Sequence, residues 1–330
     1  MQHGPASDDY LPTAPWPNLR LRAELLAQTR AFFAARGFLE VETPLLSADV
    51  VVDRYLDPLA VTLPADPRQP DRGMKLWLQT SPEFGMKRLL AAGAEAIYQI
   101  ARAFRAGERG PLHNPEFTLV EWYRQGDDMA AGMQTLSDLA EALLQLGPAE
   151  RVSYAEAFIA HVGLDPHRAS VAELRAAGER RGVPTSPGFA DADRDNWLNL
   201  LLAELVEPHL GRSRPTILYD YPARQAALAQ VSGAPPVARR FELYARGIEL
   251  ANGYQELLDP QVLAERSRTA NAQRQAEGKP PLPEDSRLLA AMRKGLPACT
   301  GVALGFDRVV MLAAGANTLD AVWAFPIERA

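Results

Sequence analysis

Cysteine is almost absent from this sequence, and its scarcity excludes several kinds of protein. The 330 residues include a single cysteine, Cys299, so the chain can form neither an internal disulfide nor a cysteine-rich metal site. No apolar run approaches the roughly 20 residues that a membrane span requires. Cationic residues are not in excess either, since 35 Lys and Arg against 41 Asp and Glu give a formal charge of −6. General binding to nucleic acid is therefore disfavoured, and we expect no membrane association and a reducing, cytoplasmic setting.

The N-terminal segment also lacks the features of a secretory signal. Residues 1–17 contain Asp8, Asp9 and four prolines, with neither a basic start nor an apolar stretch. We expect a flexible tail over residues 1–17 and a folded region over residues 18–330. A hydrophobic fraction of 47% is ample for a core, either in one large α/β unit or in two modest domains.

Hydrophobic periodicity predicts alternating helices and strands. The first helix is expected over residues 19–36, with Gly37 at its end, and a short strand follows before Pro44. Further strands are predicted over residues 75–80, 97–104, 117–123, 216–219, 241–253 and 301–306. Further helices are predicted over residues 83–91, 195–210, 261–278, 286–295 and 307–314. Residues 128–215 are expected to be mainly helical, and the charged helix over 261–278 is expected to be exposed.

A polar loop that begins at Arg105 separates two of the predicted strands. A planar guanidinium at the start of such a loop can bind a phosphate through two parallel hydrogen bonds. Phe117, on the return strand, offers a stacking face for a purine base. A charged surface hairpin with a core phenylalanine would explain the same residues, so the loop alone leaves both interpretations open.

Three glutamates, Glu242, Glu249 and Glu256, recur at intervals of seven residues. If Arg246-Gly247 forms a turn, residue 244 opposes Glu249, and Glu242 and Glu249 share one face of the sheet. Two carboxylates so placed repel each other unless a cation lies between them, and Mg²⁺ that carries ATP phosphates is the usual solution. An acidic exposed face would explain the carboxylates, although not their apolar surroundings.

Glu256 would lie on the opposite face of a regular strand, because side chains alternate with a period of two. It joins the other two glutamates only if the chain is irregular between them. We expect that irregularity at Asn252-Gly253, where a bulge forms easily.

A third segment, Gly301 to Arg308, combines small residues with a cation at the start of a predicted helix. Glycines let a ligand approach the backbone, and a helix N-terminus favours bound anions. A tight corner between a strand and a helix, with the arginine in an ion pair, would give the same pattern.

In this order, the first helix and strand up to Pro44, the segment from Phe104-Arg105 to Phe117, and the segment from Gly301 to Arg308 resemble motifs 1, 2 and 3 of the class II aminoacyl-tRNA synthetases. The resemblance covers about residues 18–330. His113-Asn114-Pro115-Glu116-Phe117 and the stretch from Glu249 to Leu257 are similar to the lysyl subclass. The resemblance implies an α/β (α+β) fold with an antiparallel sheet flanked by helices and a helical insertion over about residues 128–215. Motif 1 begins near Leu19, so we expect no anticodon-binding domain, and the chain then resembles the stand-alone elongation factor P–(R)-β-lysine ligases.

That resemblance implies an ATP-dependent, AMP-forming ligase that uses Mg²⁺. Its substrates would be (R)-β-lysine and a lysine side chain of elongation factor P, and it would act as a homodimer without recognising a tRNA anticodon. Two alternatives stay open. A truncated lysyl-tRNA synthetase-like enzyme could charge an RNA or a small molecule with lysine, and a catalytically dead paralogue could act as a binding subunit.

The resemblance also assigns roles to single residues, of which Arg105, Glu249 and Arg308 would be catalytic. The expected ATP-binding residues are Arg105, Glu108, His113, Asn114, Phe117, Glu249, Leu250, Gly305 and Arg308. The expected substrate-binding residues are Ser81, Pro82, Glu83, Tyr123, Asn252, Glu256 and Ala303. The expected Mg²⁺ ligands are Glu242 and Glu249.

Two positions depart from the family pattern. Gly107 occupies the place of the glutamate that usually reads the adenine amino group, so Glu108 or a backbone carbonyl would take over that role. Ala303 replaces the central glycine of motif 3 in lysyl-tRNA synthetases. Its methyl group would favour an amine on the β-carbon over one on the α-carbon by ~1–3 kcal/mol.

Overall fold

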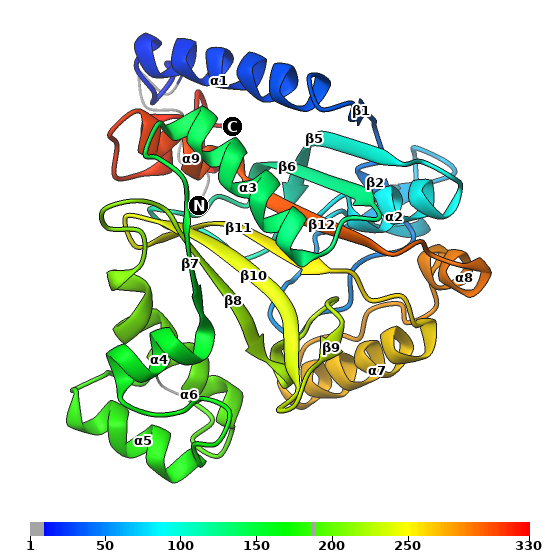
Figure 1. Ribbon diagram of the computed structural model, residues 1–330. Coiled ribbons are helices and arrows are strands. Elements are labelled where there is room, and N and C mark those ends of the chain that lie inside the picture. The colour runs from blue at the N-terminus through cyan, green and yellow to red at the C-terminus, as the bar shows by residue number, and fades with distance from the viewer. Residues whose placement is uncertain (1–9, 187–188) are drawn as a thin grey trace. The chain divides into compact units, whose positions relative to one another are not determined.

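The computed structural model describes residues 10–186 and 189–330 and shows a mixed α/β fold, in which mostly antiparallel strands are flanked by helices (Figure 1). The predicted fold class is therefore confirmed. The described residues form two compact units: the first contains residues 10–125, 258–298 and 303–330, and the second contains residues 126–186, 189–257 and 299–302. Within the described residues, no helix is long and apolar enough to cross a membrane.

The first unit contains most of the N-terminal and C-terminal elements. Its helices are α1 (Trp16–Ala34), α2 (Glu83–Ala91), α7 (Pro260–Ala276), α8 (Arg287–Lys294) and α9 (Phe306–Ala313). Its strands are β1 (Leu39–Glu40), β2 (Leu46–Ser47), β3 (Ala60–Pro64), β4 (Gly73–Leu78), β5 (Ala96–Phe104) and β6 (Glu116–Gln125). Strand β12 (Cys299–Gly305) begins in the second unit and ends in the first.

The hairpin of β5 and β6 is the main strand pair of the first unit. Its strands pair antiparallel from Ala96↔Arg124 to Phe104↔Glu116, as the sequence predicts, and β1 runs parallel to β5. The buried ring of Phe33 on α1 stacks on Tyr98 of β5 with centroids 4.5 Å apart and lies 5.3 Å from Trp122 of β6. These aromatic contacts fix the first helix against the hairpin.

A separate three-stranded sheet, in the order β2-β4-β3, precedes helix α2. Strand β4 and helix α2 agree with the predicted elements, whereas β3 lies in a stretch with no predicted strand. Part of the segment predicted as a flexible tail has defined contacts: the amides of Thr13 and Ala14 donate to the carbonyls of Ala324 and Trp323. The remainder of that prediction, residues 1–9, lies outside the described residues.

The second unit combines a hairpin-based sheet with four helices. Its helices are α3 (Met129–Leu144), α4 (Tyr154–Val162), α5 (Val171–Arg180) and α6 (Arg194–Leu201). Its strands are β7 (Glu150–Ser153), β8 (Thr216–Pro222), β9 (Val231–Ser232), β10 (Val237–Ala245) and β11 (Ile248–Gln255). Strands β8, β10 and β11 pair antiparallel, and β7 runs parallel to β8. All four helices lie within the predicted helical stretch, which also contains the unpredicted strand β7.

Helices α4, α5 and α6 of the second unit pack around one apolar cluster. Tyr154, Phe158, Trp197 and Tyr221 are all buried in it, and α4 to α6 gather beside β7 and β8 (Figure 1). Helix α3 approaches the sheet closely at Gly132, where a Cβ atom would lie 2.2 Å from the side chain of Thr300. Glycine is therefore required at that position for the helix to pack as it does.

Helix α7 differs from its prediction as an exposed helix. Leu263, Ser267, Asn271 and Arg274 form a buried stripe along it, and three of the four are polar. Composition suggested a solvated helix because 10 of its 17 residues are polar. The structure shows instead that one polar face is covered by neighbouring loops.

Candidate active site

Arg105, the first residue of the β5–β6 loop, lies over the ring of Phe117, with its guanidinium carbon 4.8 Å from the ring centroid. Glu108 is 3.8 Å from the same guanidinium. The Nε atom of Arg105 is buried, and no acceptor among the described residues forms a hydrogen bond with it. A buried donor without an acceptor costs about 1–3 kcal/mol, so this atom is suited to bind an anionic oxygen supplied by a ligand.

Arg308, in the first turn of α9, contacts the far end of the same loop. Its Nε donates to the carbonyl of Leu112 at 3.3 Å, and its terminal nitrogen lies 2.9 Å from Nε2 of His113. Burial, and then the charge of Arg308, lower the pKa of His113 below its usual 6.5. A neutral His113 accepts the hydrogen bond from Arg308 through Nε2, so the pair holds the loop and the arginine together.

Asn114 braces the loop from within. Its Nδ2 donates to the carbonyl of Glu116 at 2.7 Å, and its Oδ1 accepts the amide of Ile327 at 3.1 Å. The side chain is almost fully buried, and both of these partners are backbone groups of the protein. Gly107, beside the predicted adenine-reading position, has a φ of 79°, a conformation that glycine adopts at little cost.

Gly305 and Ala303, two further motif 3 positions with predicted ligand contacts, lie at the end of β12. Both are half-buried, and Gly305 immediately precedes the first residue of α9. The small side chains leave the backbone accessible where the strand passes into the helix.

A buried acidic cluster lies at the start of α2 and on β6. The Ser81 hydroxyl donates to Oε2 of Glu121 at 2.6 Å, and the Tyr123 hydroxyl donates to Oε1 of Glu121 at 2.5 Å. Lys87 forms an ion pair with Glu83 one helical turn away, and its ammonium lies 5.9 Å from the centroid of the Tyr123 ring. Three of the predicted substrate residues, Ser81, Glu83 and Tyr123, are therefore brought together.

Glu121 was missed by sequence reasoning, although it occupies the centre of this cluster. Its exposed fraction is 1%, and burial, followed by repulsion from Glu83, raises its pKa to about 7. One signal could have found it: Glu121 is two residues before Tyr123 on a strand, so their side chains share a face. With one cation and two carboxylates, the cluster is suited to accept a further ammonium group.

The hairpin of β10 and β11 carries the second group of predicted residues. Tyr244 opposes Glu249, as the sequence analysis expected from a turn at Arg246-Gly247. The register then shifts, because Leu243 opposes Ala251 and Leu250 is passed over. Leu250 is thus the extra residue of a β-bulge, and its backbone is displaced from the regular ladder.

This bulge decides which side chains share a face. Beyond it, Glu242 opposes Asn252 and Arg240 opposes Tyr254, so the alternation restarts one residue out of phase. Glu249 and Asn252 therefore lie on one face, and continued alternation assigns Glu256 to it as well. The irregularity expected at Asn252-Gly253 exists, but it lies earlier, at Leu250.

Glu242 is held by three donors on this face. Arg240 donates to Oε1, while the hydroxyls of Tyr221 and Tyr244 donate to Oε2. Burial, and then the charge of Glu242, raise the pKa values of both tyrosines well above 10.0, so both keep the protons that they donate. The carboxylate is fixed in one orientation by these contacts.

Glu242 and Glu249 share one face of this hairpin, so they are the residues that could hold a Mg²⁺ ion whose other ligands are phosphate oxygens and water. Mg²⁺ is usually bound through one or two carboxylates together with substrate phosphates, and it does not need a complete protein cage. In keeping with this, the described part of the chain contains no group of three or more His, Cys, Asp or Glu side chains arranged for a metal.

Asn252 and Glu256 complete the predicted residues of this hairpin. Asn252 Nδ2 donates to the Tyr254 hydroxyl at 2.9 Å, and its Oδ1 accepts from Arg240 at 3.3 Å. Glu256 is 1% exposed, and its carbonyl accepts from Gln230 at 2.9 Å. A buried carboxylate of this kind needs a cationic or hydrogen-bonding partner.

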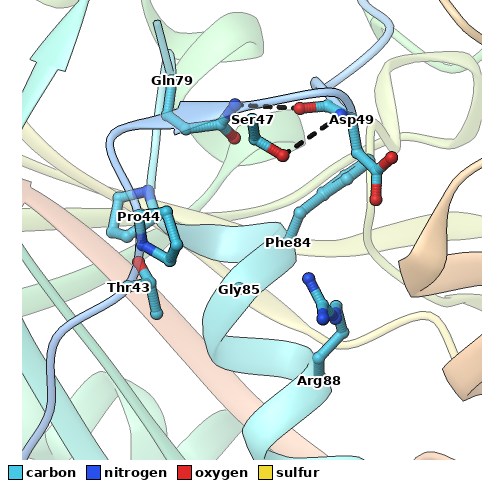
Figure 2. A pocket seen from close by; sticks show the side chains of 9 residues that line it. Thr43, Pro44, Ser47, Asp49, Gln79, Phe84, Gly85 and Arg88 are labelled. Carbon is cyan, nitrogen blue, oxygen red and sulfur yellow. Dashed lines mark hydrogen bonds between the residues drawn. The ribbon is translucent and has the colours of Figure 1, made fainter. Parts of the chain in front are cut away.

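A small pocket of about 30 Å³ lies beside the acidic cluster of the first unit (Figure 2). Pro82, a predicted substrate residue, lines it together with Phe84 and Arg88 of α2. Gln79 donates to the carbonyl of Asp49 across its rim, and the amide of Asp49 donates to Ser47 (Figure 2). The pocket has the volume of a water molecule or two, so it is too small for an amino acid.

Comparisons with known proteins agree with the motifs. Residues 15–329 match the family described as tRNA synthetases class II (D, K and N). An elongation factor P–(R)-β-lysine ligase of Klebsiella pneumoniae subsp. pneumoniae is 47% identical over 97% of this chain and 98% of its own. Proteins of the same name from Salmonella arizonae and Salmonella typhi are each 46% identical, with the same coverage of both chains.

Proposed function

Because this chain belongs to the class II (D, K and N) tRNA synthetase family, we propose that it uses ATP to activate (R)-β-lysine and transfers it to a lysine side chain of elongation factor P. The relatives that carry this name span the chain almost completely. The proposed catalytic region is residues 18–330, with a homodimeric, cytoplasmic enzyme and no anticodon recognition as further predictions.

The observation that most supports ATP chemistry is Arg105. Its guanidinium is held over an aromatic ring, and its buried Nε has no acceptor among the described residues. A planar cation with an unsatisfied buried donor is stabilised most by a phosphate oxygen, which would accept the hydrogen bond and balance the positive charge. The adenine would then displace the guanidinium from the face of Phe117 and stack there.

The proposed reaction has two steps. A carboxylate oxygen of β-lysine attacks the α-phosphorus of ATP in line, a P–O bond forms, and the bond to the leaving pyrophosphate breaks. Arg105 and Arg308 stabilise the charge that develops on the phosphoryl oxygens. The uncharged ε-amine of the acceptor lysine then attacks the carbonyl carbon of the mixed anhydride, so an amide forms, AMP leaves and the amine loses a proton.

Mg²⁺, held by Glu242 and Glu249, would neutralise phosphate charge during the first step. Tyr221, Tyr244 and Arg240 keep Glu242 in one orientation and so limit the reorganisation that metal binding requires.

Substrate selection is proposed to rest on the acidic cluster of Ser81, Glu83, Glu121 and Tyr123. Carboxylates and a tyrosyl hydroxyl are the groups that a buried ammonium needs, and β-lysine carries two ammonium groups. A bound cation would favour the charged form of Glu121, whose pKa burial has raised to about 7.

ATP–pyrophosphate exchange with (R)-β-lysine and with α-lysine tests the first step. We expect exchange that is faster with β-lysine, followed by transfer of labelled β-lysine to elongation factor P. Absence of exchange with both acids would refute the proposed activation. Transfer of the label to tRNA, with none to elongation factor P, would instead support the lysyl-tRNA synthetase-like alternative.

Glu249→Gln tests the metal assignment. We expect exchange to be abolished while the melting temperature changes little, because the substitution keeps the size of the side chain. Unchanged exchange at limiting Mg²⁺ would contradict the assignment.

A further inference from the structure

The buried polar stripe of α7 has no part in the proposed chemistry, yet it includes an arginine whose burial costs considerable free energy. Arg274 is 2% exposed, and a guanidinium is stable in such surroundings only when its donors find acceptors. Its Nε donates to the carbonyl of Pro280 at 3.3 Å. The other contacts of this guanidinium are with a single loop, residues 53–57.

Arg274 holds that loop through three groups. Its terminal nitrogen donates to the carbonyls of Asp53 and Leu56 at 3.0 and 3.2 Å and lies 2.8 Å from a carboxylate oxygen of Asp57. Lys279 binds the other carboxylate oxygen of Asp57 at 2.9 Å. Burial alone would raise the pKa of Asp57, but hydrogen bonds from Lys279 and Arg274 outweigh that effect and hold the pKa below its usual 3.8.

The loop in turn contacts the proposed ATP site. The carbonyl of Asp57 accepts a hydrogen bond from the amide of Ala106 at 2.7 Å. Ala106 follows Arg105 directly, and the amide of Arg105 itself donates to the carbonyl of Pro115 at 2.9 Å. The backbone around Arg105 is thus fixed on one side by its own hairpin and on the other by Asp57.

We infer that Arg274 is a positioning residue for Arg105, because it fixes Asp57, whose carbonyl fixes the peptide next to Arg105. The inference rests on the proposed function, in which Arg105 binds the phosphate of ATP. A buried ion pair contributes little net stability, and its value here lies in the geometry that it imposes. Arg274→Lys keeps the charge but loses the Nε contact with Pro280, and its ammonium ends one bond short of the terminal nitrogen that contacts the three acceptors.

Hydrogen exchange of the ligand-free protein tests the physical connection. We expect Arg274→Lys and Asp57→Asn to increase the exchange rate of peptides that cover residues 104–112. The matched control is Glu277→Gln, which removes the ion pair between Glu277 and Arg54, another residue of this loop, and leaves the contacts of Asp57 in place. Unchanged exchange over residues 104–112 in both variants would overturn the inference.

Steady-state pyrophosphate exchange tests the functional consequence. We expect both variants to lower kcat/KM for ATP about 3- to 10-fold, the effect of losing a hydrogen bond or two, with KM for β-lysine changed less than twofold. A general loss of structure would also raise KM for β-lysine, and that result would overturn the positioning role.

The two proposals fail in different ways. If the wild-type protein shows no pyrophosphate exchange, the proposed function fails, and with it the role of Arg274 toward ATP. If the wild type is active and the variants are indistinguishable from it in kcat/KM for ATP, only the positioning role fails.

Discussion

Replacement of Glu121 by glutamine should make the ligand-free protein more stable at alkaline pH and a poorer enzyme. Burial raises the pKa of Glu121 from 4.5 to about 7 in the folded state, whereas the unfolded chain ionises it at its ordinary value. At pH values between 4.5 and about 7, Glu121 keeps its proton in the folded protein and loses it in the unfolded chain. The free energy of unfolding therefore falls as pH rises through this window, and glutamine, which does not titrate, removes the effect.

The magnitude follows from the two pKa values. The interval between 4.5 and about 7, at 1.36 kcal/mol per pH unit, corresponds to about 3 kcal/mol. The stability of Glu121→Gln relative to the wild type should therefore increase by about 3 kcal/mol between pH 4.5 and pH 8. Ser81 and Tyr123 can each rotate a hydroxyl to meet the amide, so new unpaired groups do not obscure the change.

Urea unfolding of both proteins at several pH values measures this difference. Glu116→Gln is the matched control, because Glu116 lies on the same strand with 43% of its side chain exposed, where ion pairs contribute about 0–1 kcal/mol. A difference between Glu121→Gln and the wild type that does not vary with pH would refute the raised pKa.

The cost of the substitution should appear in substrate binding. Loss of a buried carboxylate that faces an ammonium costs about 2 kcal/mol or more, so KM for β-lysine should rise about 30-fold or more. An unchanged KM for β-lysine would show that Glu121 does not face the substrate.

Three further substitutions test the remaining residues. Arg105→Met should lower the rate of pyrophosphate exchange by about 10²-fold or more. The melting temperature should not fall, because the substitution also removes a buried donor that has no acceptor among the described residues, and a large loss of stability would contradict this account. Protonation of His113 below pH 6.5 should weaken its contact with Arg308 and raise KM for ATP. His113→Gln should remove this dependence of KM on pH, and the same pH dependence of KM in the variant and the wild type would exclude this role. Ala303→Gly should increase the use of α-lysine relative to β-lysine by about 5- to 150-fold, as measured by the two kcat/KM values, and an unchanged ratio would refute the role of the methyl group.

The candidate site could be predicted from sequence wherever one short segment carries the information. Arg105 and Phe117 follow from a polar loop between two strands, and the structure brings them together. The pairing of Tyr244 with Glu249 follows from a two-residue turn, and it is confirmed. In both cases the residues are close along the chain, so local periodicity and turn chemistry determine their relation.

Other features depend on contacts between segments that are distant in sequence. In the sequence, Glu121 is a polar residue between the apolar Val120 and Trp122, and nothing there shows that Ser81 and Glu83, at and just before the start of α2, approach it. The bulge at Leu250 shifts the register of β10 and β11, and no turn signal marks it. Register and burial depend on the partner strand and the covering loops, which local sequence patterns do not identify.

The sequence by itself determined the main helices and strands other than β3 and β7, the three motifs and most of the residues proposed to carry the chemistry, because these depend on residue type and spacing. The tertiary structure alone decided that Glu121 is buried with a raised pKa, that Glu249 and Asn252 share a face, and that Arg274 lies beneath the loop next to Arg105. Arg274 shows the physical reason most clearly. A charged residue in a polar helix is normally solvated, and only the loop folded over it turns that charge into a fixed contact.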